Sequence, residues 1–322
     1  MFHVREKLYR YVLLLTVIAV AYPGILVAAE KKDSDTAAAS ATEIGKEFPQ
    51  ELETLITEEP QEEASLPFEA DTYVRYMPSR RVDAMPGKVG IIESANECAY
   101  KLKAFGKLQL ELSFESNYIS INNSTGVKLP SHLTSLIAGL QTTVPFFTLD
   151  KTYFRIGLYP SYRGENWEVR SSAFRMPVNT YLIYQPNSKW TFVAGVGAYP
   201  DYRTKVIPIF GFIYKPNEKL TFNIVPANPN ISYSLNGKVT LFIEGGMAGD
   251  EYEVDKDGLK NVVLEYKAYR GGAGASYRFN KYIEASVSVG GVFNRRLQYR
   301  DSLGKVNLDS GMYSEFRINA AI

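Results

Sequence analysis

Apolar and polar residues alternate with a period of two along much of this chain, and this period restricts the possible folds most strongly. In residues 107–115 the large apolar side chains all share one parity: Leu108, Leu110, Leu112 and Phe114. A helix would spread such residues around its circumference, whereas a strand places them on one face. The alternation returns in residues 189–198, 283–290 and 312–322. The 23 Tyr and 17 Phe also suit pleated, half-buried surfaces. The sequence therefore predicts an all-β body.

A short turn motif recurs between these predicted strands. The sequence Tyr-Gln-Pro-Asn-Ser-Lys at residues 184–189 is echoed by Tyr-Lys-Pro-Asn-Glu-Lys at residues 214–219, with weaker copies around Asn236 and Asn280. Proline fixes φ, and asparagine accepts turn conformations, so each copy predicts a tight hairpin turn. Because the turns are alike while the intervals between them vary, we expect short turns at one end of the sheet and unequal loops at the other.

The polar face of the predicted strands carries charges of both signs, as the interior of a membrane barrel does. We expect eight charged residues to face the lumen: Glu111, Glu115, Arg155, Glu244, Arg278, Glu284, Glu315 and Arg317. Aromatic residues beside the turns fit an interfacial girdle: Tyr184, Trp190, Tyr214, Tyr233, Tyr277 and Tyr282. Residues 68–322 are therefore predicted to form an antiparallel transmembrane β-barrel of about 12–14 strands. A soluble, secreted β-sandwich that binds a ligand is the alternative fold.

The first 29 residues have the pattern of a targeting segment and are not expected to be part of the fold. Three basic residues precede an apolar run at residues 11–27, which ends in Val27-Ala28-Ala29. This pattern predicts a secretory signal peptide cleaved near Ala29. An N-terminal membrane anchor is the alternative, but a membrane-spanning helix needs about 20 apolar residues. We therefore expect the mature protein to reach the outer membrane of a Gram-negative cell.

Residues 30–67 differ in composition from the body that follows. They hold eleven Asp and Glu against three Lys, and such a segment cannot bury enough apolar surface to fold alone. We predict a disordered, acidic periplasmic tether. Several apolar residues in residues 44–56 recur at helical spacing, so a short helix that docks a partner or plugs a pore is the alternative.

The Pro-Asn turns, together with residues 211–217 (GFIYKPN) and 290–294 (GGVFN), resemble an uncharacterised family of bacterial outer-membrane β-barrel proteins, a domain of unknown function. The resemblance covers roughly residues 70–322. It implies a fold and a location. It implies no substrate and no catalytic residues.

The chain offers few residues for catalysis or metal binding. The only cysteine is Cys98, and His132 is the one histidine beyond the predicted leader. His132 follows Ser131, but neighbouring residues in a strand point to opposite faces, so we predict no catalytic residues and no enzyme. Residues 250–257 (DEYEVDKD) lack the central glycine of an EF-hand and predict an acidic outer loop, with loose divalent binding as the alternative. We expect no cofactor and no metal site.

These observations predict a passive channel or transport barrel for small solutes. The alternative is a non-conducting barrel that acts through structure or surface interactions. The expected partners are outer-membrane lipid and lipopolysaccharide, the barrel assembly machinery and small solutes. The net charge of +1 argues against nucleic acid. Near the outer end of a strand, Arg295, Arg296 and Arg300 are expected to be solvated charges, with contact to lipid phosphates or a place at a pore mouth as the alternatives.

Overall fold

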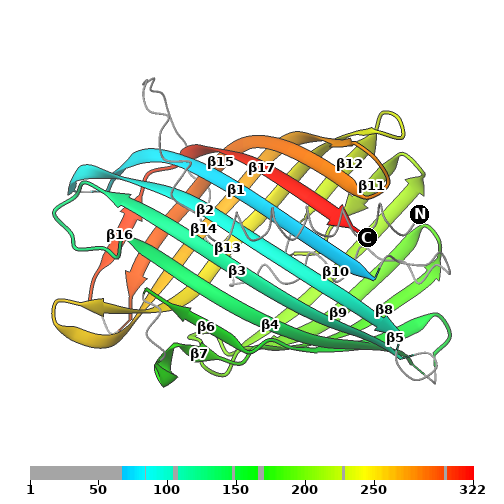
Figure 1. The fold of residues 1–322 in the computed structure, drawn as a ribbon, viewed down its shortest axis with the longest axis horizontal. Coiled ribbons are helices and arrows are strands. Elements are labelled where there is room, and N and C mark those ends of the chain that lie inside the picture. Colours follow the sequence, from blue (N-terminus) through cyan, green and yellow to red (C-terminus); the bar gives the residue numbers. More distant parts are fainter. Residues whose placement is uncertain are drawn as a thin grey trace, which may run out of the picture. The chain divides into compact units, whose positions relative to one another are not determined.

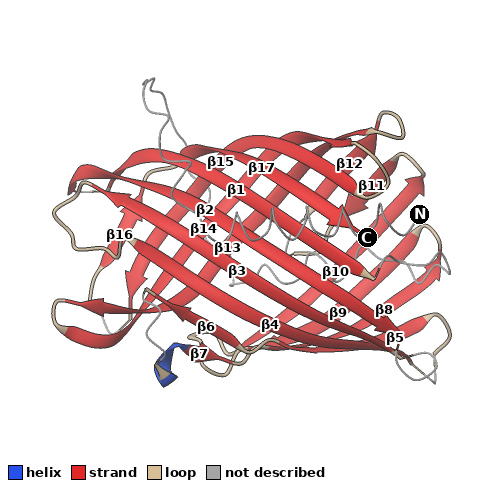
Figure 2. Cartoon of the chain, viewed as in Figure 1, coloured by secondary structure: helices blue, strands red, loops and turns tan. Residues whose placement is uncertain are grey.

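A computed structural model describes residues 67–83, 85–103, 108–146, 149–165, 170–226, 229–300 and 303–322. The predicted signal peptide, and the acidic segment up to residue 66, lie outside the described residues. Within the described part of the chain, no helix is long and apolar enough to cross a membrane. Figure 2 shows strands throughout, with the short 3-10 turn η3 (Ser171–Ala173) beside β7.

The described residues form seventeen strands in a single sheet. Their bounds are β1 (Phe68–Val82), β2 (Met85–Lys103), β3 (Gln109–Asn123), β4 (His132–Pro145), β5 (Thr152–Leu158), β6 (Ser161–Gly164), β7 (Phe174–Arg175), β8 (Val178–Asn187), β9 (Trp190–Ala198), β10 (Val206–Asn217), β11 (Leu220–Asn223), β12 (Asn230–Ser234), β13 (Val239–Lys256), β14 (Leu259–Arg278), β15 (Ile283–Tyr299), β16 (Lys305–Leu308) and β17 (Gly311–Ala321).

The sheet closes on itself, because β1 pairs antiparallel with both β2 and β17 (Figure 1). We call each continuous crossing of the barrel wall a stave. Three staves consist of two strands separated by a short break. β5 and β6 both pair with β4; β8 and β7 pair with β5 and β6 in turn; and β16 and β17 both lie between β15 and β1. The seventeen described strands therefore make fourteen staves, and the predicted antiparallel β-barrel is confirmed.

The apolar side chains of the alternating strands point outward. Phe114 and Val287 are 47% and 55% exposed, whereas Ser288, the neighbour of Val287, is 3% exposed. In water such a belt would be unfavourable, and in a bilayer it is the lipid-facing surface. The alternation identified in the sequence therefore describes a barrel with an apolar outer surface.

We call one end of the barrel the inner end. It carries the short turns, the start of β1 and the end of β17. The Phe68 N–H donates to the Ile322 carbonyl at 3.0 Å. At the turn after β10, the Asn217 side-chain oxygen accepts the N–H groups of Lys219 and Leu220 at 2.9 and 3.1 Å. The same pair of hydrogen bonds recurs at three more turns, built on Asn187, Asn236 and Asn280. Each repeated motif is thus an asparagine-capped hairpin turn.

The strands differ greatly in length, and the long ones form a second, narrower structure. β9 and β10 have 9 and 12 residues, whereas β13 and β14 have 18 and 20. About 9–11 residues suffice to cross a bilayer. Beyond that level β13 leaves β12 and meets β6 in parallel, at Glu253 and Gly164. We call the part built by the outer ends of β1–β4, β6 and β13–β16 the outer extension.

The inside of the outer extension is packed with apolar side chains, which we call the apolar core. Its buried members are Met77, Val82, Val89, Ile91, Ile119, Ile121, Leu133, Tyr252, Val254, Val262, Leu264, Tyr266, Ala268, Val292, Leu297, Tyr299, Val306, Leu308 and Tyr313. They come from both the barrel wall and the β13–β14 hairpin. The lumen is therefore filled at this level.

A β-bulge in β15 changes which residues face inward. Asn294 has a φ of 49°, and the register shifts between Lys267 and Tyr269 on the paired strand β14. As a result Arg295 points inward and is 1% exposed. The expectation that Arg295 is a solvated charge is therefore wrong, because the extra residue reverses the alternation and buries the side chain.

Candidate functional site

A cavity of about 610 Å³ lies inside the inner half of the barrel. Four of the sequence-predicted lumen residues line it: Glu115, Arg278, Glu284 and Arg317. The remaining lining includes Tyr73, Tyr282, four asparagines and five alanines. The cavity reaches the inner end, since the turn residues Asn280 and Lys281 belong to its wall.

Six residues of the cavity wall form one row across six adjacent staves. In strand order they are Arg278, Glu284, Asn319, Asp71, Glu97 and Glu115, each the direct cross-strand partner of the next. Three carboxylates stand side by side in this row, which we call the acidic row: Asp71, Glu97 and Glu115. Like charges opposite each other destabilise a sheet, so this arrangement is explained by what it does to the cavity. The whole lining has five carboxylates against three basic side chains, an excess that attracts cations.

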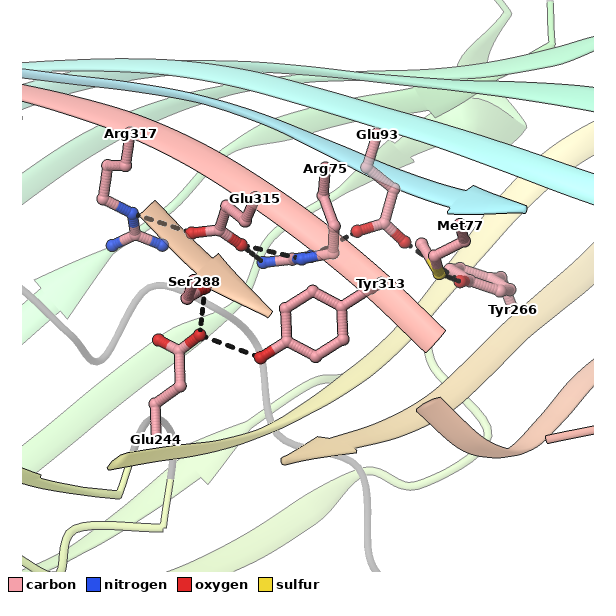
Figure 3. A network of polar contacts seen from close by, with 9 residues as sticks. All are labelled: Arg75, Met77, Glu93, Glu244, Tyr266, Ser288, Tyr313, Glu315 and Arg317. Atoms are coloured by element: carbon pink, nitrogen blue, oxygen red, sulfur yellow. Dashed lines mark hydrogen bonds and ion pairs between the residues drawn. The ribbon is translucent and has the colours of Figure 1, made fainter. Parts of the chain in front are cut away.

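A buried ion-pair network, which we call the polar ceiling, lies on the outer side of the cavity, and Figure 3 shows its residues. Arg75 lies between two carboxylates, as the cross-strand partner of both Glu93 and Glu315. Its guanidinium pairs with Glu93 and lies 2.6 Å from Glu315 Oε2. Arg317, at the cavity wall, donates to the other oxygen of Glu315 at 3.2 Å. Arg75 is 1% exposed, so the network is sealed from solvent.

Two tyrosines tie the polar ceiling to the strands around it. The Tyr266 hydroxyl donates to Glu93 Oε1 at 2.9 Å. Glu244 accepts hydrogen bonds from the Tyr313 hydroxyl at 2.9 Å and from Ser288 Oγ at 2.8 Å. Figure 3 shows the Tyr313 ring beside Arg75, whose guanidinium carbon lies 5.9 Å from the ring centroid. Since Tyr266 and Tyr313 also belong to the apolar core, the ceiling and the core form one continuous obstruction.

The two remaining predicted lumen residues, Glu111 and Arg155, lie away from the cavity lining. Arg155 donates to Thr143 Oγ1 at 2.7 Å, across the β4–β5 pair. Glu111 is half-buried and lies opposite Lys101 on β2.

The acidic stretch 250–257 was expected to be an outer loop, but up to Lys256 it belongs to β13 in the outer extension, and most of its carboxylates pair with arginines. Asp250 pairs with Arg163, and Glu251 pairs with Arg300. Arg170 lies 2.7 Å from Asp255, and this hydrogen bond holds the pKa of the Asp255 carboxyl below its usual value. No cluster of three potential metal-binding side chains occurs among the described residues. The stretch is therefore a set of ion pairs that fasten the β13–β14 hairpin.

Ser131 and His132 contact each other, contrary to expectation. Ser131 Oγ lies 3.0 Å from His132 Nδ1. The alternation rule does not apply to this pair, because β4 begins only at His132. The His132 ring stacks on Tyr118 with 5.7 Å between the centroids.

Sequence reasoning missed Arg75 and Glu93, although a signal for both was present. Arg75 shares the parity of Asp71 on the first strand, and Glu93 shares the parity of Glu97 on the second. Two neighbouring strands that each carry a charge at this parity, of opposite sign, indicate a buried pair. The two tyrosines of the ceiling carried no such signal, since tyrosine is frequent on both faces.

Two solved structures and one family of proteins are similar to this chain. It is similar to the COG4313 outer membrane channel from Pseudomonas putida F1, at 10% identity and a TM-score of 0.46, over 82% of this chain and 100% of that one. It is also similar to the NanC porin, at 9% identity and a TM-score of 0.38, over 79% of this chain and 100% of that one. No curated protein matches the sequence. Residues 157–322, just over half of the chain, match the family described as "Domain of unknown function (DUF6268)", and the protein belongs to that family.

Proposed function

We propose that this protein is an outer-membrane channel for small polar solutes that prefers cations and is closed in the conformation described here. The observation that carries the proposal is the cavity with its acidic row, inside a barrel whose outer surface is apolar. Membrane channels that select cations are commonly lined by rings of Asp and Glu. A purely structural barrel has no need of three adjacent carboxylates, which repel one another.

The obstruction of the lumen determines how a solute could pass through such a channel. A solute in the cavity meets the polar ceiling and then the apolar core, and neither leaves space for it. Passage therefore requires the β13–β14 hairpin to move away from the wall. The ion pairs at the hairpin end, such as Arg170 with Asp255, hold it in the closed position.

Single-channel recording in planar bilayers tests this proposal. The mature chain is compared with a variant that lacks residues 250–266 and joins Gly249 to Lys267 by an Asn-Gly turn. Gly249 and Lys267 are direct cross-strand partners, so the new turn preserves the register. We expect rare or absent steps from the full chain and steady, cation-selective steps from the variant. A heat-dependent shift on gels verifies that both are folded.

The acidic row is tested in the same recording. In the variant with the shortened hairpin, replacing Asp71, Glu97 and Glu115 by their amides should move the reversal potential in a KCl gradient towards zero. Glu218→Gln, at an exposed turn, is the matched control and should leave it unchanged. Equal selectivity in both variants would remove the acidic row from the proposal.

A second function, a non-conducting barrel that acts through its outer extension, is favoured by one observation. The apolar core resembles the core of a soluble domain, and opening it would expose apolar surface to water. If the folded variant with the shortened hairpin stays silent, this second function replaces the first.

We also propose that this protein is located in the outer membrane. We expect cleavage near Ala29, insertion by the barrel assembly machinery, and contact with lipopolysaccharide at the outer end. The apolar outer surface supports a membrane location. Fractionation of cells on a density gradient would test it, and recovery in the soluble fraction would contradict it.

A further inference from the structure

The short turns at the inner end repeat one chemical unit around the barrel. Five described turns carry an exposed lysine: Lys151, Lys189, Lys219, Lys238 and Lys281. At three of them the lysine N–H is held by the capping asparagine, which fixes the position of the residue at the tip. None of the five forms an ion pair within 4.0 Å of a carboxylate in the described residues. The described residues of these turns contribute only two acidic side chains, Asp150 and Glu218.

An outward tyrosine accompanies the lysine at most of these turns. Tyr184, Tyr214 and Tyr233 each precede a turn lysine by five residues, and Tyr277 precedes Lys281 by four. The rings join into a belt across β8–β11. The centroids of Trp190 and Tyr214 lie 4.2 Å apart, and those of Tyr184 and Phe192 lie 6.4 Å apart. Such aromatic belts mark the boundary between hydrocarbon and headgroups, so the lysines lie at the level of the lipid phosphates.

The spacing of the lysines argues against a single small anion as the ligand. Strands lie about 4.8 Å apart, so turns that join successive pairs of strands are about 10 Å from each other. Five lysines spread over several such distances cannot all converge on one phosphate. The four that do not line the cavity can, however, each meet a separate headgroup in a lipid leaflet, with the aliphatic stem lying along the barrel surface.

We infer that the turn lysines and the aromatic belt together form a binding surface for anionic phospholipid headgroups in the leaflet at the inner end. Positive charge beside a membrane attracts anionic lipid over a short range. The tyrosines set the depth of the barrel, and the lysines select the lipids that surround it. This inference needs the barrel to be in a membrane and does not depend on conduction.

The experiment measures which lipids surround the full mature chain in vesicles. The chain is refolded into phosphatidylcholine that contains spin-labelled phosphatidylglycerol or spin-labelled phosphatidylcholine, and the motionally restricted fraction of each probe is compared. The test variant replaces Lys189, Lys219 and Lys238 by Gln. The matched control replaces three exposed lysines of the outer end: Lys88, Lys128 and Lys305. These lie on or beside the outer extension, beyond the lipid.

We expect a preference for phosphatidylglycerol in the full chain and in the control. In the test variant the ratio of the two association constants should fall to about one, since each lost charge weakens the attraction. Sodium phosphate is then compared with sodium chloride at equal ionic strength. If phosphate displaces the lipid more strongly, the lysines bind free phosphate and the inference is wrong. A full preference in the test variant, or an equal loss in the control, would also overturn it. A heat-dependent gel shift confirms that each variant is folded.

Discussion

Arg75 is the side chain whose replacement best tests whether the lumen is sealed. The change Arg75→Met keeps an unbranched, flexible side chain and removes the cation between Glu93 and Glu315. Both carboxylates have side chains only 4% exposed. Arg317 still pairs with Glu315, so the uncompensated charge falls mainly on Glu93. Breaking a buried ion pair on one side costs about 3–5 kcal/mol, and we expect the lower end of that range.

The measurement is the free energy of unfolding in urea, followed by tryptophan fluorescence of the chain in lipid vesicles. The double variant Arg75→Met/Glu93→Gln is the control. Its neutral amide still accepts the Tyr266 hydrogen bond without a buried charge, so most of the lost stability should return. If Arg75→Met costs less than about 1 kcal/mol, the value of a solvated surface pair, the network is hydrated. The lumen would then be open to water and our description of the ceiling would be wrong.

Further substitutions test the membrane face, the turns and the outer extension. At the outward position, Val287→Arg should cost about 2–4 kcal/mol in urea titrations, whereas Ser286→Arg on the inward face should cost far less; equal costs would contradict the facing. Asn217→Ala removes the acceptor of two backbone hydrogen bonds and should lower stability by about 1 kcal/mol, visible as a lower urea midpoint. The pKa of Asp255 is held below its ordinary value of 3.8 by Arg170. This contribution is present above pH 3.8 and lost as the pH falls through the lowered pKa. The protection factors of the amides at the hairpin end, which correct for the intrinsic exchange rate, should therefore fall in acid, and Arg170→Gln should abolish the difference.

The wall of the barrel could be predicted from the sequence because its determinants are local. Alternation sets the strand and its lipid face, and an asparagine such as Asn187 sets a turn through its own hydrogen bonds to the two following N–H groups. These signals suffice for the antiparallel β-barrel. The site depends on contacts between distant strands. Arg75 and Glu315 are 240 residues apart in sequence, and no local pattern connects them.

The outer extension was not predicted from the sequence, and the reason is not sequence separation. It is that the medium around the strands changes from lipid to water. Alternation shows that one face is apolar, but it does not say whether lipid or protein covers that face. In the membrane part the apolar face points outward, as Phe114 does. In the outer extension water surrounds the strands, so the apolar face must point inward, as Ile119 and Ile121 do. A strand that passes from one surrounding to the other must therefore move its apolar residues to the other face, either by a change in their parity or by a bulge.

The sequence of β3 contains such a change of parity. Along β3 the apolar residues are even-numbered up to Phe114 and odd-numbered from Ile119 onward. β15 reaches the same result by inserting a residue: Val287 points outward, and Leu297, beyond the bulge at Asn294, points inward at 0% exposure. The position of each switch marks where lipid ends and water begins. A switch part-way along a long alternating strand thus predicts a barrel that continues beyond the membrane and encloses its own apolar core, and the closed lumen follows from it.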